Sequence, residues 1–384
     1  MRIAVFSSYF PPANLGGGPI RTLGALVANL PDDTEAVVIT RNTDLGFTAP
    51  MSVTSDVWLE FGDAKVRYVS SGSVVSWWKA VGATRSFQAD FVYVNSFFDA
   101  RFSILPQVLA RLGAFGRVRV VMAPRGEFGS GVMALKRRKK QVYLRVFRML
   151  CLGRGLIWHA SSQRERGDIV NVIGHEAHIV VRENSTDLPF SADGSPDRKE
   201  GPLRAVYLAR LVPIKRLALL LSALQDVTAP LSLDVFGPAE DVTYAKHCRQ
   251  IADSFPDHID VRFRGPIDHA MVRSTLSDYD VMLFPTGGEN FGHVIAEALS
   301  VACPVMCADT TPWTPRLRDG GGVVVDADTV EGWTHAVDDY AVQLPDQLEQ
   351  RRRQAATAYA EWRQEASEHE HFFTMLSRSR PQRA

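Results

Sequence analysis

The sequence predicts an α/β protein made of two Rossmann-like domains in series. Short apolar runs alternate along the chain with amphipathic segments of helical length, a rhythm typical of parallel sheets covered by helices. This rhythm stops shortly after residue 190 and then restarts. The chain has 384 residues, and at roughly 100–200 residues per domain this length also indicates two domains.

Each half of the chain supplies its own set of expected strands. In the first half they are 3–6, 36–40, 91–94, 118–123 and 156–160. In the second half they are 204–209, 231–236, 261–264, 281–285, 304–308 and 322–325. Residues 191–202 form the break richest in proline, glycine and charge, and we expect the linker there. It separates an N-terminal domain, residues 1–190, from a C-terminal domain, residues 203–384.

The last segment, from about residue 345 to residue 377, is charged and predicts one long helix. Its aromatic side chains Trp362, Phe372 and Phe373 are candidate docking residues. Whether this helix docks back on the first domain stays open.

Composition excludes several classes of protein. Hydrophobic residues make up 46% and charged residues 22% of the chain, a globular balance that excludes disordered and fibrous proteins. The 43 Lys and Arg balance the 43 Asp and Glu, which argues against a dedicated nucleic-acid binder. No stretch approaches the roughly 20 apolar residues of a membrane span.

The cysteines and the first residues favour a cytoplasmic protein. Cys151, Cys248, Cys303 and Cys307 form no CxxC pair and no spacing typical of zinc sites. We therefore expect neither a disulfide scaffold nor a structural metal. The first apolar run ends at Ser7, too early for a signal peptide.

The most informative motif follows the expected strand 281–285. A glycine-rich turn with Glu289, Gly292 and His293 leads into an expected helix that contains Glu297. Backbone N–H groups at the start of a helix bind phosphate, and glycine lets the phosphate approach the main chain. The two carboxylates can accept hydrogen bonds from sugar hydroxyls. A tight turn with two solvated glutamates is the alternative, although Glu297 lies among apolar residues and a buried carboxylate requires partners.

A pair of basic residues follows another expected strand. Arg210 and Lys215 lie five positions apart across a proline-containing turn. Both can reach one diphosphate, the arginine as a planar fork and the lysine as a mobile charge. Two solvated loop cations are the alternative.

A glycine triplet follows the first expected strand and precedes a helix. Its members Gly17 and Gly18 are candidates for closing over a sugar phosphate or shaping the acceptor side. The GxGxxG pattern of nicotinamide-binding domains is absent from this turn, which argues against a dehydrogenase.

These motifs together resemble the retaining GT-B glycosyltransferases of family four. The spacing of Glu289 and Glu297, with Phe291 and Gly292 between them, is similar to the donor-binding signature of that family. Further similarities, in the same order along the chain, are Phe10-Pro11-Pro12 with Gly16–Gly18, residues 209–215, and Pro304-Val305. Residues 124–128, 289–293 and 309–313 also resemble a bacterial branch associated with capsule, exopolysaccharide or lipopolysaccharide assembly.

The resemblance implies a fold and an activity. The fold is GT-B, with two Rossmann-like domains facing each other across a cleft. The activity is metal-independent transfer of a hexose, with retained configuration, from a nucleotide diphosphate sugar to a glycan or lipid-linked acceptor in cell-surface polysaccharide synthesis. The nucleotide sugar is a co-substrate, and no cofactor is expected. A catalytically silent sugar-nucleotide-binding protein and a GT-B-fold epimerase remain alternatives.

The resemblance also implies roles for the residues of these motifs. The expected catalytic residues are Glu289, Arg210 and Lys215, of which the two cations stabilise the leaving diphosphate. The expected donor-binding residues are Gly17, Gly18, Arg210, Lys215, Asn290, Phe291, Gly292, His293 and Glu297.

The acceptor side is expected in the first domain. Many relatives carry a histidine after the strand that is 118–123 here, whereas this chain has Arg125 and Glu127, which become acceptor-side candidates. Asn95, at the carboxyl end of another expected strand, is a third candidate. His159 is a fourth, although a hydrogen-bonded core histidine is the more ordinary interpretation.

Two Asp-x-Asp pairs, at 278–280 and 326–328, match the metal-binding motif of another glycosyltransferase fold. Neither pair has a further acidic ligand nearby in sequence. We therefore expect chance matches and no metal site.

Charge is distributed unevenly along the chain. Residues 1–190 hold 23 Lys and Arg against 15 Asp and Glu. Within them, five consecutive basic residues from Lys136 to Lys140 precede apolar residues interleaved with Arg145 and Arg148, which predicts a basic amphipathic helix. Such a helix suits the anionic inner face of the plasma membrane. A solvated helix packed on its own domain is the alternative.

Overall fold

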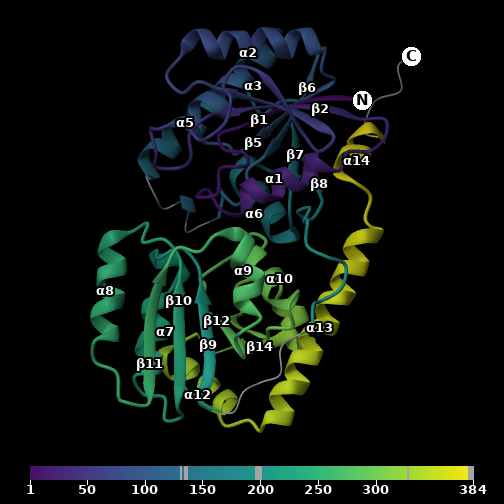
Figure 1. Cartoon of the computed structure of the whole chain (residues 1–384). Helices are drawn as coiled ribbons and strands as arrows, with labels where there is room; N and C mark the ends of the chain where they lie inside the picture. Colours follow the sequence, from purple (N-terminus) through teal and green to yellow (C-terminus); the bar gives the residue numbers. More distant parts are fainter. Residues whose placement is uncertain (130–131, 134–136, 195–200, 327, 379–384) are drawn as a thin grey trace. The chain divides into compact units, whose positions relative to one another are not determined.

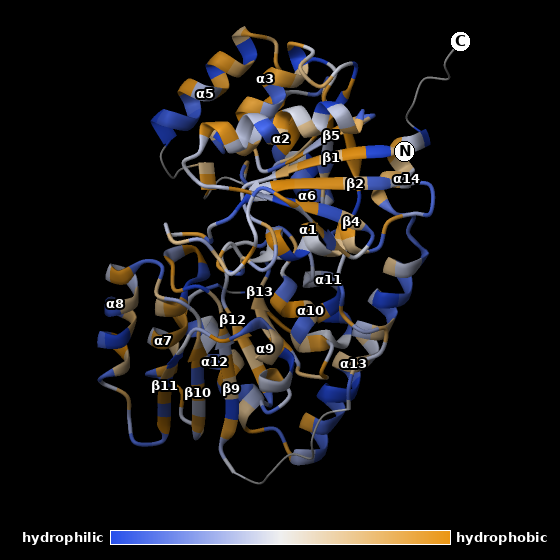
Figure 2. Cartoon of the chain, turned by 45° about the horizontal axis from the view of Figure 1, so that its top comes forward, coloured by the Kyte–Doolittle hydropathy of each residue, from blue (hydrophilic) through white to orange (hydrophobic). Residues whose placement is uncertain are grey.

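The computed structural model describes residues 1–129, 132–133, 137–194, 201–326 and 328–378 and divides into two compact units. The first unit contains Met1–Asp187 and the segment that begins at His369, and the second contains Leu188–Glu368. Each unit is a sheet covered by helices (Figure 1), and Figure 2 shows that strands of both sheets are predominantly apolar. The predicted α/β architecture is confirmed.

The first unit is built on an eight-stranded sheet with the order β3-β4-β2-β1-β5-β6-β7-β8. Its strands are β1 (Arg2–Ser7), β2 (Glu35–Arg41), β3 (Trp58–Phe61), β4 (Ala64–Val69), β5 (Phe91–Asn95), β6 (Arg119–Ala123), β7 (Ile157–Ala160) and β8 (His178–Val181). Only the β3–β4 pair is antiparallel. The helices are α1 (Gly18–Ala28), α2 (Val74–Phe87), η1 (Ala100–Ile104), α3 (Leu105–Arg111), α5 (Arg137–Met149), α6 (Gln163–Ile173) and α14 (Phe372–Arg378).

Both faces of the first sheet are apolar. Alternate side chains of β1 lie on opposite faces of the sheet. Ala4 and Phe6 belong to the core shared with α2, α3, α5 and α6. Ile3 and Val5 belong to the core shared with α1 and α14. Because both faces are covered, the central strands read as continuous apolar runs rather than alternating ones.

The second unit is an all-parallel, six-stranded sheet with the order β11-β10-β9-β12-β13-β14. Its strands are β9 (Leu203–Leu208), β10 (Leu231–Phe236), β11 (Ile259–Gly265), β12 (Val281–Phe284), β13 (Val305–Ala308) and β14 (Gly322–Val325). The helices are η2 (Pro213–Lys215), α7 (Leu217–Leu224), α8 (Val242–Ala252), α9 (His269–Leu276), α10 (His293–Leu299), α11 (Thr314–Arg316), η3 (Leu317–Gly321), α12 (Val330–Ala341) and α13 (Pro345–Glu368). The order reverses between β9 and β12, the switch point of this sheet.

Every expected strand is present, but the sequence analysis missed β3, β4 and β8. These strands lie at or next to the edges of the first sheet. There, burial is incomplete: β4 alternates buried positions with the exposed Lys65 and the partly buried Arg67, and β8 has no fully buried residue. In β4 these charged residues interrupt the continuous apolar run by which the central strands were found, and in β8 that run covers only residues 179–181.

The prediction of one helix over residues 345–377 is wrong. The segment forms α13 and α14, separated at His369–His371, and only α14 belongs to the first unit. Phe372 and Phe373 of α14 enter the core beside α1, and His371 Nε2 lies 3.1 Å from the Leu26 carbonyl oxygen. The burial of Phe372 and Phe373 makes α14 part of the first unit.

The change of unit occurs at Asp187–Leu188, before the expected linker at 191–202. Leu188 enters a core of the second unit, and Arg363 of α13 donates to the carbonyl oxygens of Leu188 and Pro189. Asp193 pairs with Arg273. Residues 188–194 thus pack on the second unit, while residues 195–200 lie outside the described ranges. In the described ranges, no helix is both long enough and apolar enough to span a bilayer.

Candidate functional site

Except for Gly17 and Gly18, which lie in the first unit, the predicted donor residues belong to the second unit and follow its strands β9 and β12. The loop after β9 carries Arg210 and Lys215, and the loop after β12 carries Thr286 and Glu289. In open parallel sheets, ligands bind at the carboxyl edge where the strand order reverses, because the loops diverge there and leave room. The reversal between β9 and β12 lies between these two loops.

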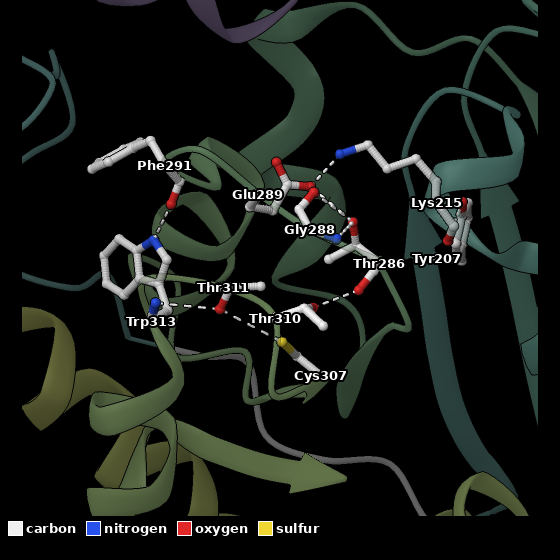
Figure 3. Close-up of polar contacts among 10 residues, drawn as sticks. All are labelled: Tyr207, Lys215, Thr286, Gly288, Glu289, Phe291, Cys307, Thr310, Thr311 and Trp313. Atoms are coloured by element: carbon white, nitrogen blue, oxygen red, sulfur yellow. Dashed lines mark hydrogen bonds and ion pairs between the residues drawn. The ribbon is translucent and has the colours of Figure 1, made fainter. Parts of the chain in front are cut away.

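Lys215 and Glu289 meet across the switch point (Figure 3). Nζ of Lys215 donates to Oε1 of Glu289, and each side chain keeps 14% of its surface exposed. The hydroxyl of Thr286 donates to the same carboxylate oxygen at 3.3 Å. The pair is therefore largely shielded from water, which strengthens its charge interactions, yet each side chain remains accessible to a ligand.

Hydrogen bonds between the loops hold this pair in place. Thr310, from the loop after β13, donates from Oγ1 to the Thr286 carbonyl at 2.6 Å, and Gly287 N donates to the Ile214 carbonyl at 2.8 Å. Tyr207 in β9 donates to the Lys215 carbonyl at 3.3 Å. Hydrogen bonds thus join the loops after three strands to one another.

Arg210 has a different neighbour. Its Nη1 donates to Oε2 of Glu240, from the loop after β10, at 2.6 Å. Both side chains are more than 40% exposed, and exposed pairs of this kind contribute at most about 1 kcal/mol. A ligand phosphate can therefore take Arg210 from Glu240 at little cost.

The predicted strand, glycine-rich turn and helix are all present between β12 and α10. Gly292 is the N-cap of α10 with φ 86°, in the left-handed region, and an added Cβ would lie 3.1 Å from Ile295 and 3.3 Å from Trp313. The carbonyl of Phe291 accepts from Trp313 Nε1 at 2.6 Å, and the Phe291 ring is buried. Asn290 and His293 are partly exposed on either side of this turn.

Glu297 lies in the middle of α10 with only 2% of its surface exposed. Its Oε1 is 3.4 Å from Nδ1 of His269, the first residue of α9. The sequence analysis missed His269. Nothing in its local sequence marks it, because its neighbour in space is 28 positions further along the chain.

Three of the four acceptor-side candidates, Asn95, Arg125 and His159, belong to a buried network near the carboxyl ends of β5, β6 and β7. Arg125 donates from Nε to Asn95 Oδ1 at 2.9 Å, from Nη2 to the Tyr93 hydroxyl at 2.6 Å and from Nη1 to Asn184 Oδ1 at 2.6 Å. The Tyr93 hydroxyl lies 2.8 Å from Nδ1 of His159. Tyr93 and Asn184 were not anticipated from the sequence.

The protonation states in this network follow from its geometry. His159 Nε2 is 3.0 Å from the Arg182 carbonyl, which only accepts, so Nε2 carries the hydrogen and Nδ1 accepts from Tyr93. Burial, reinforced by the Arg125 charge, holds the pKa of His159 well below its usual value. Burial raises the pKa of Tyr93 to about 12. Both side chains are neutral near pH 7, as in a hydrogen-bonded core histidine.

Glu127 stands apart from this network. Its carboxylate accepts from Ser96 Oγ at 2.7 Å, from Phe98 N at 3.2 Å and from Phe97 N. Burial raises the pKa of Glu127. The residue thus holds the loop that follows β5.

Gly17 and Gly18 lie at the switch point of the first sheet, where the order reverses between β1 and β5. Gly17 caps α1 with φ 71°, and Gly18 is the first residue of that helix. Asp44, after β2, accepts from Asn14 N at 3.0 Å and so ties down the loop that leads to the glycines.

The Asp-x-Asp pairs have arginine neighbours. Asp280 is buried at the amino end of β12, the edge opposite the candidate site, and accepts from Arg204 N at 2.9 Å. Asp326 pairs with Arg318, and Asp328 pairs with Arg216. Residue 327 lies outside the described ranges, and within those ranges no three His, Cys, Asp or Glu side chains form a cluster that could hold a metal.

Sequence comparison relates the second unit to glycosyltransferases. Residues 202–341 match the family model described as glycosyl transferases group 1. Over 151 residues, the chain is 30% identical to the phosphatidyl-myo-inositol mannosyltransferase of Mycolicibacterium smegmatis, covering 38% of this chain and 37% of the relative. The Mycobacterium leprae protein of the same name is 32% identical over 112 residues, 28% of each chain. The chain thus spans 28–37% of the length of these relatives.

Comparison of structures covers nearly the whole chain. Sucrose-phosphate synthase from Thermosynechococcus elongatus has a TM-score of 0.75 at 15% identity, with 99% of this chain and 100% of that chain covered. Anabaena HepE, in complex with UDP and glucose, has a TM-score of 0.69 at 16% identity, with 99% of both chains covered. These similarities confirm the predicted GT-B fold.

Proposed function

We propose that this chain transfers a sugar from a nucleotide diphosphate sugar, which binds at the carboxyl edge of the second sheet. The observation that carries the proposal is the convergence of Lys215 and Glu289 at the β9–β12 switch point. Both residues lie within the segment that matches group 1 glycosyltransferases. The UDP complex of the structurally similar Anabaena HepE supports a nucleotide sugar as the donor.

In this proposal each site residue has a chemical task. Lys215 and Arg210 neutralise the diphosphate as its bond to the anomeric carbon breaks, Glu289 accepts hydroxyl groups of the transferred hexose, and Glu297 accepts the ribose hydroxyls. The acceptor oxygen forms the new bond to the anomeric carbon, and its proton passes to the departing phosphate. Glu289 already accepts from Lys215 and Thr286, so it is held as a carboxylate acceptor. We propose retained configuration, in line with the family that the motifs resemble.

We further propose a glycan or lipid-linked acceptor on the cytoplasmic side of the membrane, in the synthesis of a surface polysaccharide. The partial similarity to phosphatidyl-myo-inositol mannosyltransferases supports a lipid-linked acceptor. The exposed basic side chains of α5 support contact of the first unit with an anionic membrane surface.

Thermal shift with UDP-, GDP- and ADP-sugars tests donor binding. A sugar nucleotide at 100 times its Kd should stabilise the folded protein by about 2.7 kcal/mol. Product analysis of each stabilising compound then distinguishes the activities. Release of the nucleoside diphosphate with sugar on an acceptor or on water indicates transfer, an altered sugar nucleotide indicates an epimerase, and unchanged donor indicates a silent binder.

Glu297→Gln is expected to weaken donor binding by about 1.5–3 kcal/mol, because the ribose hydroxyls lose a charged acceptor. Isothermal titration with the donor measures the change. Glu331→Gln, on the exposed surface of α12, is the matched control and should bind like the unmodified chain. An unchanged donor Kd in a folded Glu297→Gln variant would remove Glu297 from the donor site.

Transfer activity is expected to persist in excess EDTA, because Lys215 and Arg210 supply the positive charge at the diphosphate. Initial rates with and without chelator check this. Loss of activity that Mg²⁺ or Mn²⁺ restores would show that a divalent ion shares the diphosphate.

A further inference from the structure

The outer helices on one face of the first sheet present a cationic surface. Residues 74–154 contain 15 Lys and Arg against three Asp and Glu, and α2, α3 and α5 contain no acidic residue. Asp90 and Glu127 accept backbone N–H groups, Asp99 pairs with Arg41, and Glu127 also lies near Lys140 of α5. The charged residues of these three helices are therefore all basic.

The same surface exposes apolar side chains. Of the 17 large apolar side chains exposed in the described ranges, nine belong to this segment. They are Val74, Val75, Trp78, Leu112, Val132, Val142, Val146, Met149 and Leu150. The combination of exposed apolar groups with an excess of positive charge is typical of surfaces that enter the headgroup region of an anionic membrane.

The faces of α5 are clearly separated. Leu144 and Phe147 are its buried residues and join the core of the first unit. At about 100° per residue, Val142, Val146 and Met149 lie on the side opposite these two. Only part of the apolar character of α5 is therefore used for packing on its own domain. Arg138 and Arg145 flank the outer apolar strip on one side and Lys139 on the other, and all three are exposed.

The first turns of α2 provide a second exposed apolar element. Trp77 points into the core, where its ring centroid lies 5.1 Å from that of Phe102. Trp78 is 51% exposed, and Val74 and Val75 beside it are more than 60% exposed. Of the seven Trp, all of which lie in the described ranges, Trp78 alone is exposed. Indole rings are enriched at membrane interfaces because they join an apolar body to a polar N–H group.

Topology places these elements on one side of the first sheet. The buried residues of α2, α3 and α5 belong to the same core, and both overall views show the three helices over the same face (Figures 1 and 2). The helices follow β4, β5 and β6 respectively, and the chain leaves each of these strands at the carboxyl edge of the sheet. Asn95 and Gly17 lie at that same edge, where the proposed function expects the acceptor.

We propose that the outer surface of α2 and α5 docks the first unit on an anionic lipid bilayer, with Trp78 inserted at the interface. Arg137, Arg138, Lys139 and Arg145 contact the lipid phosphates, and the apolar strip of α5 lies against the acyl boundary. That this surface brings the protein to a lipid-linked acceptor rests on the proposed function. The docking itself requires no donor, so the two can fail separately.

Vesicle co-sedimentation at 0.1 M and 1 M salt tests the charge contribution. The chain should partition onto phosphatidylglycerol vesicles at least tenfold more strongly than onto phosphatidylcholine vesicles at 0.1 M salt. Salt should weaken this preference, because the Debye length falls from about 10 Å at 0.1 M to about 3 Å at 1 M. The variant R137Q/R138Q/K139Q/R145Q should lose at least tenfold in partitioning. The control K246Q/R249Q/R262Q/R353Q removes four exposed charges from the second unit and should partition like the unmodified chain.

Quenching of Trp fluorescence by brominated phosphatidylglycerol tests the insertion. Quenching should occur in the unmodified chain and disappear in Trp78→Phe, which keeps an apolar ring and should still bind vesicles. Trp78→Ser should lower partitioning. No quenching in the unmodified chain, or equal binding to both vesicle types, would overturn the proposal. Concentration-dependent dimerisation that Trp78→Ser abolishes would assign the surface to a second copy and would also overturn it.

Donor titration separates this proposal from the proposed function. The fourfold α5 variant should keep the donor Kd of the unmodified chain. If donor binds and the vesicles do not, the membrane surface is wrong and the donor site stands. If vesicles bind as expected and no sugar nucleotide does, the donor site is wrong and the membrane surface stands.

Discussion

Lys215→Ala is expected to lower the rate of sugar transfer by two to three orders of magnitude. Removal of one group that stabilises transition-state charge in a shielded site costs about 10²–10³ in kcat. Here the loss is compounded because Lys215 also neutralises Glu289. Without the lysine, the Glu289 carboxylate would face the leaving diphosphate uncompensated.

Steady-state kinetics with saturating donor measure this effect. Lys215→Arg keeps the positive charge on a side chain of different shape and should recover part of the rate. Lys246 is an exposed lysine of α8, and Lys246→Ala is the control. Glu289→Gln should lower kcat more than it weakens binding of the free nucleotide, since its proposed partner is the sugar. The double variant should lose less than the product of the single losses, because the two residues act as a pair. A kcat within threefold of the unmodified chain in Lys215→Ala would remove Lys215 from the chemistry.

Phe372→Ala is expected to destabilise the first unit by about 3–5 kcal/mol, the usual cost of emptying a buried phenylalanine site. Phe372 is 1% exposed and stacks on His159, with ring centroids 3.7 Å apart and planes 10° apart. It also contacts Tyr93 edge to face. The ring therefore closes the apolar side of the Arg125 network.

Urea denaturation followed by circular dichroism measures the stability. Thr374→Ala, a partly exposed neighbour in α14, is the control and should change stability by less than about 0.5 kcal/mol. Ending the chain at Glu368 removes Phe372, Phe373 and Leu376 together. The free energy lost with the burial of these three side chains is comparable to the roughly 5–15 kcal/mol that stabilises a typical domain. The first unit should then fail to fold. A truncated chain with an unchanged first unfolding transition would contradict this role of α14.

The sequence predicted the fold where burial is complete. The central strands are continuous apolar runs because helices cover both faces of each sheet, and they were found at nearly the observed positions. Strand β4 was missed because Lys65 and Arg67 interrupt the run. The break between α13 and α14 is not marked by a proline or glycine in the local sequence, and Phe372 beyond it is buried in a core formed by residues much earlier in the chain.

The candidate site was predictable only in part. Lys215 and Glu289 follow strands in recognisable motifs, so their types and their edge of the sheet could be inferred. His269 could not, because only folding brings α9 beside Glu297. The acceptor-side candidates do follow neighbouring strands as expected. The partners that complete their network could not be inferred: buried Tyr93 joins Arg125 to His159, and Asn184, 59 positions from Arg125, accepts a further hydrogen bond from it.

The most direct test of the donor site is nucleoside diphosphate release from a bound sugar nucleotide in the presence of EDTA, compared between the 384-residue chain and its Lys215→Ala variant. We expect the unmodified chain to release the nucleoside diphosphate, slowly onto water and faster once an acceptor is added, and the variant to release it at least 100-fold more slowly. Absence of release by the unmodified chain from every UDP-, GDP- and ADP-sugar, or equal release by both proteins, would contradict a sugar-transfer site at the switch point of the second sheet.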